Sequence, residues 1–354
     1  MPLLLSLVLL MTGCASYKIC RHVKPVLTEV ARSDRQWTGI AVSRDGRIFV
    51  NYPRWSDNVP FSVGELHPDG SVSPYPDAEL NRWEPTLAAA EHFVCVQSVV
   101  VDREGYLWIL DPASPSFQGV VAGGPKLLKI DLTTNRIIQT VRFAQPIIKA
   151  ESYLNDVRID TQRKVAYITD SGVGAIVVVD LVSGTSRQLL ANHPSTHSEG
   201  LVLTIEGRPW RRPDGSAPQI HADGIALDNE GYYLYYQALT GRTLYRIETR
   251  WLRDVAITEK ELAAKVETLG QTGAADGLIY SPDGRIYLSA LEEDAIKSYV
   301  PGGRAEIVVK SPELAWPDSF AFGPDGSLYV TTSQIHRGPK PPEPYKIYKL
   351  ERKP

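Results

Sequence analysis

Six polar side chains recur at equivalent places along the chain, and three of them are carboxylates. Each stands five positions before the residue that opens a tight turn, and they are Thr38, Gln97, Asn155, Asp223, Asp276 and Asp318. Carboxylates held close together repel one another unless a proton, a metal ion or a cationic ligand compensates their charge. Carboxylate, amide and hydroxyl oxygens are suitable ligands for a hard cation such as Ca²⁺. They could equally accept charge-assisted hydrogen bonds from an ammonium group. The six residues therefore predict a binding site for a metal ion or a cationic ligand, provided that the fold brings them together.

A second interpretation applies to each aspartate taken alone. Asp followed by Gly, as at Asp223 and Asp276, often accepts hydrogen bonds from the backbone of its own turn. Turn chemistry does not explain six polar residues in register, so for the whole set we favour a site. Asp276 and His221 are the candidate catalytic residues, because a carboxylate at such a site and an imidazole two residues before Asp223 could each act as a base. The sequence leaves open whether any reaction is catalysed.

The segments that carry these residues repeat one pattern at a mean spacing of about 56 residues. Each begins with the polar residue, continues with alternating apolar residues, turns, and resumes as an aromatic-containing strand. This alternation around a turn predicts a β-hairpin. Two more strand-like runs follow each hairpin, most clearly at 175–180 and 185–190. Four antiparallel strands per repeat predict an all-β fold, a six-bladed β-propeller over residues 38–354.

The sixth repeat ends one strand short, after the run 345–350. The lead-in around 26–30 is predicted to supply the missing strand and close the ring, which removes two exposed sheet edges. Helical character is confined to 259–266. The innermost strand of each propeller blade lines the central channel, so the six polar residues would converge around one axis.

The N-terminal segment has the features of an export signal. Residues 3–11 are an apolar run that is too short to cross a bilayer, which needs about 20 residues. Thr12, Gly13 and Cys14 follow as in a bacterial lipobox, which predicts a signal peptide over 1–13 and lipidation of Cys14. Residues 14–37 would form a lipidated tether that includes the ring-closing strand. We expect a periplasmic or outer-membrane lipoprotein that meets the membrane only through its lipid, with simple secretion as the alternative.

Composition and cysteine usage exclude several classes of partner. Lys and Arg number 38 against 41 Asp and Glu, the formal net charge is −3, and no basic tract is present, so nucleic acid is not an expected partner. The chain has neither a C-x-x-C nor an H-E-x-x-H motif, which leaves a zinc site without support. Gly-x-Ser-x-Gly is also absent. Cys20 and Cys95 could pair in an oxidising compartment or remain thiols.

Long connections are expected to rise around the channel. Residues 191–222 are far longer than an ordinary connection, and they form either a lid over the channel or a peripheral hairpin. The segments 51–60, with Tyr52 and Trp55, and 111–124, with Phe117, are expected on the same face. Aromatic walls around an acidic centre suit an aromatic or cationic small molecule.

The stretches 167–181 and 224–247 resemble the major royal jelly protein and yellow family. This resemblance extends from about residue 37 to residue 350, and it implies a secreted six-bladed propeller. Insect members of that family are linked to dopachrome conversion or bind biogenic amines. The resemblance therefore implies a small-molecule pocket, with a dopachrome-tautomerase-like isomerase as one enzymatic alternative.

A more distant resemblance is to the gluconolactonase and regucalcin propellers, which hold Ca²⁺ or Zn²⁺ at the hub. By motif, Asp223 and Asp276 fall where that family has a metal-binding Asn and Asp, and Asn155 falls at a substrate-contacting Asn. The resemblance implies Ca²⁺ at these three residues and a metal-dependent lactonase or related hydrolase. That family's first-blade Glu has no counterpart, because Thr38 begins the repeat here. A non-catalytic scaffold that binds proteins is a further alternative to our main expectation, an exported, lipid-anchored propeller that binds a small cationic or aromatic ligand.

Overall fold

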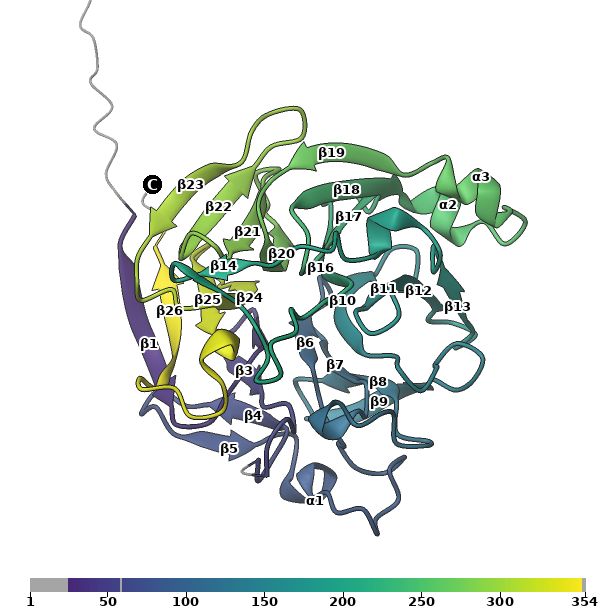
Figure 1. The fold of residues 1–354 in the computed structure, drawn as a ribbon. Coiled ribbons are helices and arrows are strands. Elements are labelled where there is room, and N and C mark those ends of the chain that lie inside the picture. The colour runs from purple at the N-terminus through teal and green to yellow at the C-terminus, as the bar shows by residue number, and fades with distance from the viewer. Residues whose placement is uncertain (1–24, 58, 352–354) are drawn as a thin grey trace, which may run out of the picture.

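The structure is a computed structural model that describes residues 25–57 and 59–351, and it confirms the six-bladed β-propeller (Figure 1). Each blade is a four-stranded antiparallel sheet. Blade 1 consists of β2 (Ile40–Val42), β3 (Ile48–Asn51), β4 (Val63–Leu66) and β5 (Val72–Pro74). Blade 2 consists of β6 (Ser98–Val101), β7 (Leu107–Asp111), β8 (Lys126–Asp131) and β9 (Arg136–Arg142). Blade 3 consists of β10 (Leu154–Asp160), β11 (Val165–Asp170), β12 (Ala175–Asp180) and β13 (Ser186–Leu189).

The second half of the ring repeats this plan. Blade 4 consists of β16 (Ala222–Leu227), β17 (Tyr233–Ala238), β18 (Thr243–Glu248) and β19 (Glu267–Gln271). Blade 5 consists of β20 (Ala275–Tyr280), β21 (Ile286–Ala290), β22 (Ala295–Tyr299) and β23 (Glu306–Lys310). Blade 6 consists of β24 (Pro317–Phe322), β25 (Leu328–Thr332), β26 (Tyr345–Leu350) and β1 (Leu27–Ser33). The first strands of neighbouring blades, from β2 round to β24, contact one another and form the hub.

The N-terminal strand closes the ring as predicted. β1 pairs antiparallel with β26, with Leu27 opposite Leu350 and Ser33 opposite Tyr345. It is therefore the outermost strand of blade 6, the blade whose other three strands come from the C-terminus. The predicted signal peptide and the predicted lipidation site Cys14 lie outside the described residues.

The hydrophobic core consists of layers between the blades. Alternate residues of each strand face the two neighbouring sheets, so each of the six blade interfaces holds its own cluster of buried apolar side chains. Trp108 and Ile168 pack between blades 2 and 3, and Trp37 packs between blades 6 and 1. These buried side chains set the distance between neighbouring blades, and therefore the diameter of the hub.

Helices are few and short. The helix expected at 259–266 is present as α3 (Glu259–Ala263), and a reciprocal capping box of Thr258 and Glu261 begins it. Two further one-turn helices are α1 (Ala78–Asn81) and α2 (Thr249–Arg253), and three 3₁₀ turns are η1 (Pro115–Phe117), η2 (Pro194–Thr196) and η3 (Ile335–Arg337). Within the described chain, none of the helices has the length and apolar character needed to cross a membrane.

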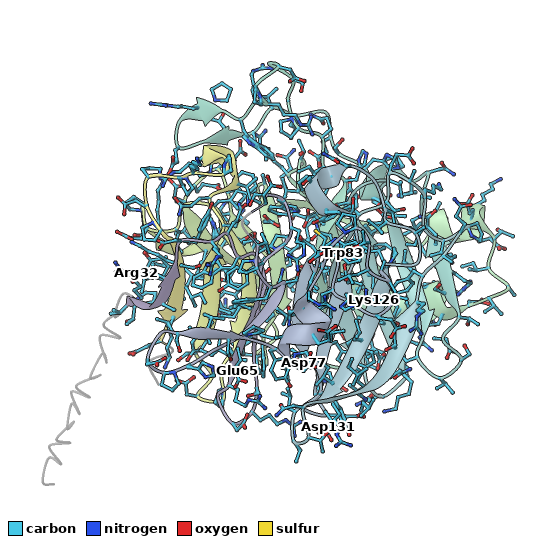
Figure 2. The ribbon with its side chains drawn as sticks, turned by 90° about the horizontal axis from the view of Figure 1, so that it is seen from below. Arg32, Glu65, Asp77, Trp83, Lys126 and Asp131 are labelled. Atoms are coloured by element: carbon cyan, nitrogen blue, oxygen red, sulfur yellow. The ribbon has the colours of Figure 1, made fainter. Side chains whose placement is uncertain are left out.

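The two faces of the propeller differ. We call the face toward the viewer in Figure 1 the loop face; it carries η1, η3 and the excursion 191–221 with its short hairpin β14 (Thr204–Ile205) and β15 (Arg208–Pro209). In the edge-on view of Figure 2 this hairpin stands at the top. The opposite face, which we call the turn face, carries the turns that follow the inner strands, such as 43–47.

The blades meet at the hub with almost no space between their backbones. A β-carbon on Gly277 would lie 2.2 Å from the carbonyl oxygen of Asp318, and one on Gly224 would lie 2.3 Å from that of Asp276. We therefore expect Gly277→Ala to destabilise the fold by about 1–3 kcal/mol in urea unfolding, because the backbone of blade 6 must move. Gly241→Ala is the matched control, because its φ is not positive and a β-carbon there would lie 3.3 Å from the nearest backbone oxygen, so its loss should be clearly smaller. Equal losses would contradict the close approach.

Candidate ligand site at the hub

The six predicted residues all lie at the start of the inner strands. Each is buried, with no more than 7% of its surface exposed. Gln97 immediately precedes β6 and Thr38 lies two residues before β2, while the other four are the second residues of β10, β16, β20 and β24. Residues that stand the same number of positions before the turn thus lie at the same height along the propeller axis.

Hydrogen bonds join these side chains across blades. Gln97 Nε2 donates to Asn155 Oδ1 (3.2 Å), and Asn155 Nδ2 donates to Asp223 Oδ2 (2.7 Å). Asp223 in turn interacts directly with the Asp276 carboxyl group. The carboxyl groups of Asp223 and Asp276 therefore meet other blades rather than their own turns, which is the arrangement that a shared site requires.

Thr38 does not take part in this network. Its Oγ1 accepts a hydrogen bond from Asn51 Nδ2 (2.9 Å), and its carbonyl oxygen accepts one from Thr331. Asn51 Nδ2 also donates to the Gln97 carbonyl oxygen (3.0 Å). Thr38 thus belongs to the contacts that join blades 6, 1 and 2.

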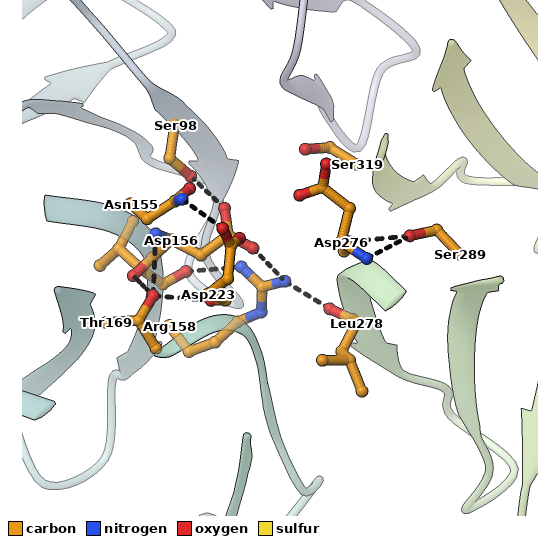
Figure 3. Close-up of polar contacts among 12 residues, drawn as sticks. Ser98, Asn155, Asp156, Arg158, Thr169, Asp223, Asp276, Leu278, Ser289 and Ser319 are labelled. Carbon is orange, nitrogen blue, oxygen red and sulfur yellow. Dashed lines mark hydrogen bonds and ion pairs between the residues drawn. The ribbon is translucent and has the colours of Figure 1, made fainter. Parts of the chain in front are cut away.

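A fourth carboxylate, which sequence reasoning missed, completes the acidic centre. Asp156 follows Asn155 in β10, accepts a hydrogen bond from Ser98 Oγ (3.1 Å), and repels the charges of Asp223, Asp276 and Asp318. We call these four aspartates the acid ring. Its nearest cation is the Arg158 guanidinium, with Nη2 3.7 Å from Asp156 Oδ2 (Figure 3). A signal existed in the sequence, because the residue that follows the polar position is Gly or Ser in the other five repeats.

Burial and mutual repulsion raise the pKa values of the acid ring. Burial, followed by the charge of Asp276, raises the pKa values of Asp223 and Asp318 well above the ordinary value. Burial also raises the pKa of Asp276 to about 7, although the hydrogen bond from Trp316 opposes the shift. The pKa of Asp156 is raised by burial, against the opposing charge of Arg158. A cation bound beside these carboxyl groups would favour their charged forms and lower their pKa values.

Aromatic side chains cover the ring on the loop face. Trp316 is fully buried and its Nε1 donates to Asp276 Oδ2 (2.7 Å). Trp210, from the excursion 191–221, packs edge-on against Trp316 with 4.7 Å between ring centroids, and His336 stacks on the other side. Glu206 of the excursion forms an ion pair with Arg337, and its carboxylate lies 3.0 Å from His336 Nε2. The excursion is therefore a packed cover over the tryptophan that holds Asp276, rather than a peripheral hairpin.

A second aromatic group stands beside the ring. Tyr153 donates through its hydroxyl to Gln97 Oε1 (2.9 Å) and accepts from Trp55 Nε1 (2.7 Å). The exposed ring of Phe117 lies 5.2 Å from Trp55 and 5.1 Å from Tyr153. The prediction for Trp55 and Phe117 is thus correct, whereas Tyr52 packs in the core between blades 6 and 1.

The remaining sequence candidates have structural partners. His221 Nδ1 accepts from the Ser198 backbone (3.0 Å), its ring lies 4.8 Å from that of His197, and burial with the His197 charge lowers its pKa. This imidazole therefore anchors the base of the excursion. Cys95 is buried, and burial raises the pKa of its thiol to about 12. Cys20, its possible partner, lies outside the described residues.

The calcium prediction fits this arrangement poorly. Asn155 turns its amide nitrogen, rather than an oxygen, toward Asp223. The described residues contain no group of three or more His, Cys, Asp or Glu side chains that could hold a metal ion. Calcium at Asp223, Asp276 and Asn155 stays a prediction that titration must test.

Comparisons with known proteins give the fold and the family. Regucalcin, a calcium-binding protein from Agrobacterium tumefaciens, aligns with a TM-score of 0.54 and 14% identity over 93% of this chain and 96% of its own. A gluconolactonase from Xanthomonas campestris aligns with a TM-score of 0.54 and 14% identity over 92% and 90% of the two chains. At such low identity these likenesses show the propeller fold alone.

Sequence relatives point to one family. Protein yellow of Drosophila madeirensis is 24% identical over 274 residues, which cover 71% of this chain and 46% of that protein. Major royal jelly protein 1 of Apis mellifera is 23% identical over 225 residues, which cover 58% and 49%. The chain thus spans about half the length of the curated relatives it matches. Residues 94–313 match the model of the major royal jelly protein family, to which this chain belongs.

Proposed function

We propose that this chain binds a small organic cation at its hub, with the positive group held by Asp223, Asp276 and Asp318. One observation carries the proposal: four buried carboxyl groups at the hub interact electrostatically and raise one another's pKa values, and Arg158 is the one cation that the described residues place against them. A buried excess of acidic groups destabilises a fold unless a ligand compensates for it. An arrangement of this kind is expected where binding has been selected.

The surroundings of the acid ring favour an organic cation. An ammonium group has several N–H donors, which the carboxyl oxygens of the acid ring would accept. The amide groups of Gln97 and Asn155 continue the polar wall of the site, and Asn155 Nδ2 donates to Asp223. Tyr153 and Trp316 cover the ring with aromatic surface, which suits the apolar part of such a ligand. Asn155, Gln97 and the acid ring are therefore the proposed binding residues.

We also propose that this binding takes place outside the cytoplasm, on a chain carried by lipid at Cys14. The support is the apolar run 3–11 and the lipobox-like residues that follow it. Globomycin treatment of expressing cells, which blocks lipoprotein signal cleavage, is the direct test of this part.

Thermal unfolding with matched probes tests the hub proposal. We expect benzylamine to raise the melting temperature and benzyl alcohol, its neutral analogue, to leave it unchanged. A ligand at 100 times its Kd stabilises a folded protein by about 2.7 kcal/mol, so saturating amine gives a shift of several degrees. Asp276→Asn should abolish the response, whereas Asp214→Asn, in an exposed turn, should keep it.

Two other outcomes would count against the proposal. Equal responses to benzylamine and benzyl alcohol would show apolar binding without charge recognition, and an undiminished response in Asp276→Asn would place the ligand elsewhere. A shift produced by Ca²⁺ and reversed by a chelator would instead favour the metal-dependent hydrolase.

A further inference from the structure

We infer that Arg158 closes the channel beneath the acid ring and restricts the hub to ligands that carry a single positive group. The inference rests on the proposed function, because it names the class of cation that the same site accepts. A ligand of this class places its one charged end at the acid ring, while the rest of the molecule is uncharged and extends toward the loop face.

Blade 3 is the exception among the six repeats. The positions equivalent to Arg158 are apolar in every other blade, and they are Ala41, Val100, Ala226, Ile279 and Ala321. The positions equivalent to Asp156 are Gly or Ser in every other blade. Both exceptions fall in β10, two residues apart, and the two charged side chains face each other. Blade 3 thus carries a charge pair at two positions where the other blades have only small or apolar residues.

The Arg158 side chain crosses the hub. Its Nη1 donates to the carbonyl oxygen of Val157 (2.7 Å), and its Nη2 donates to that of Leu278 in blade 5 (2.5 Å), past blade 4 (Figure 3). The guanidinium is therefore held by backbone carbonyls on both sides, with Asp156 above it. A side chain fixed in this way is part of the wall of the site.

Below Arg158 the channel widens into a cavity of about 170 Å³ that reaches the turn face. Its lining includes Val100, Leu227 and Ile279, the guanidinium groups of Arg103 and Arg158, and the carboxylates of Asp102 and Asp228. Both carboxylates already accept hydrogen bonds from the backbone of their own turns, and Asp102 also accepts one from Trp108 Nε1 (2.7 Å). Arg103 itself spans to blade 4, where it donates to Asn229 Oδ1 (2.8 Å). A second positive group that extended down the axis from the acid ring would therefore meet the Arg158 guanidinium before it reached these carboxylates, and it would be repelled.

Above the ring the groups that face a ligand are neutral. They are the hydroxyls of Tyr153 and Ser171 and the indole of Trp316, all buried. A second positive group directed toward the loop face would lose its hydration without gaining a carboxylate partner. Neither direction along the axis accommodates a second charge, so the structure selects monocations.

Calorimetric titration with two probes of equal length tests this selection. 1-Pentylamine and 1,4-diaminobutane each have six heavy atoms in a linear chain, but the diamine carries a second charge. We expect wild-type protein to bind pentylamine at least tenfold more tightly than diaminobutane. Arg158→Met keeps the length of the side chain and removes its charge, so it should reduce the preference to less than threefold. Arg158→Lys should retain it, because the charge remains.

Arg163→Met is the matched control, because Arg163 belongs to the same blade but pairs with Asp160 on the turn face. This variant should prefer pentylamine over diaminobutane as strongly as wild type does. Equal binding of both amines by wild type, or a full preference in Arg158→Met, would overturn the inference while leaving cation binding intact. If wild type binds neither amine, the proposed function itself fails. Should Arg158→Met not fold, the wild-type comparison and Arg158→Lys still decide the question.

Discussion

Replacing Asp276 with asparagine is expected to make the ligand-free protein more stable at pH 8 and to leave its stability near pH 4 almost unchanged. Burial raises the pKa of Asp276 from 3.8 to about 7, so between these pH values the folded chain binds a proton that the unfolded chain has released. The stability present below pH 3.8 is lost as the pH rises through about 7. Asparagine cannot ionise, and its oxygen can still accept the hydrogen bond from Trp316. At 1.36 kcal/mol per pKa unit, the gain at pH 8 is up to about 4 kcal/mol.

Urea unfolding of wild type and variant at pH 4, 6 and 8 measures this effect. Asp214→Asn serves as the control of opposite sign, because hydrogen bonds from Ser216 lower the pKa of Asp214 and its replacement should reduce stability at high pH. An Asp276→Asn protein that is less stable than wild type at pH 8 would mean that the hub charge is already compensated without a ligand. The basis of the proposed function would then be lost.

Together with the amine response, this measurement separates a binding residue from a structural one. If Asp276 held the fold together, its replacement would reduce both stability and binding. A binding residue behaves otherwise, since its replacement increases stability while binding disappears. Opposite signs for the two effects are the result that the acid ring predicts.

The architecture was predictable because its signals are local. Alternation around a turn and a repeat of constant length depend on neighbours within a few residues, and they specify hairpins and blades whatever the rest of the chain does. The closing strand β1 followed from a count of strands in the last repeat. Short helices such as α1 and α2 gave no periodic signal, because four or five residues contain little more than one 3.6-residue period and the pattern cannot repeat.

The site was predictable only in part, because register along a strand gives height on the axis but not the direction of a side chain. Asn155, Asp223 and Asp276 do meet, whereas Thr38, at the same height, turns to Asn51. Trp316 comes from the connection before a strand, where no repeat pattern exists. The charge pair of Asp156 and Arg158 could have been found by aligning the six repeats on their polar residue. The positions one and three residues later are charged in blade 3 alone.

The largest loss of stability that we expect from a single substitution follows replacement of Lys126 with methionine, at about 3–5 kcal/mol. Lys126 lies inside blade 2 (Figure 2) and is 1% exposed. Its ammonium group donates to Asp111 Oδ2 (3.1 Å) and to the carbonyl oxygens of Ala89 (3.0 Å) and Gly124 (2.9 Å). Methionine fills the same volume but leaves a buried carboxylate without its cation and two carbonyls without a donor.

The loss should reach the hub, because Asp111 also fixes the segments on either side of it. Its carboxylate accepts from the backbone N–H groups of Val94 (2.7 Å) and Cys95 (2.9 Å), just before Gln97, and of Ala113 (2.8 Å), at the start of the loop that carries Phe117. Chemical unfolding and the amine response of Lys126→Met should therefore both be impaired. Lys129→Met, on the same strand but 3.8 Å from its partner Glu104, should lose less than about 1 kcal/mol. Similar losses at the two lysines would show that the buried pair contributes no more than a surface ion pair, and that the segment before Gln97 is held by other contacts.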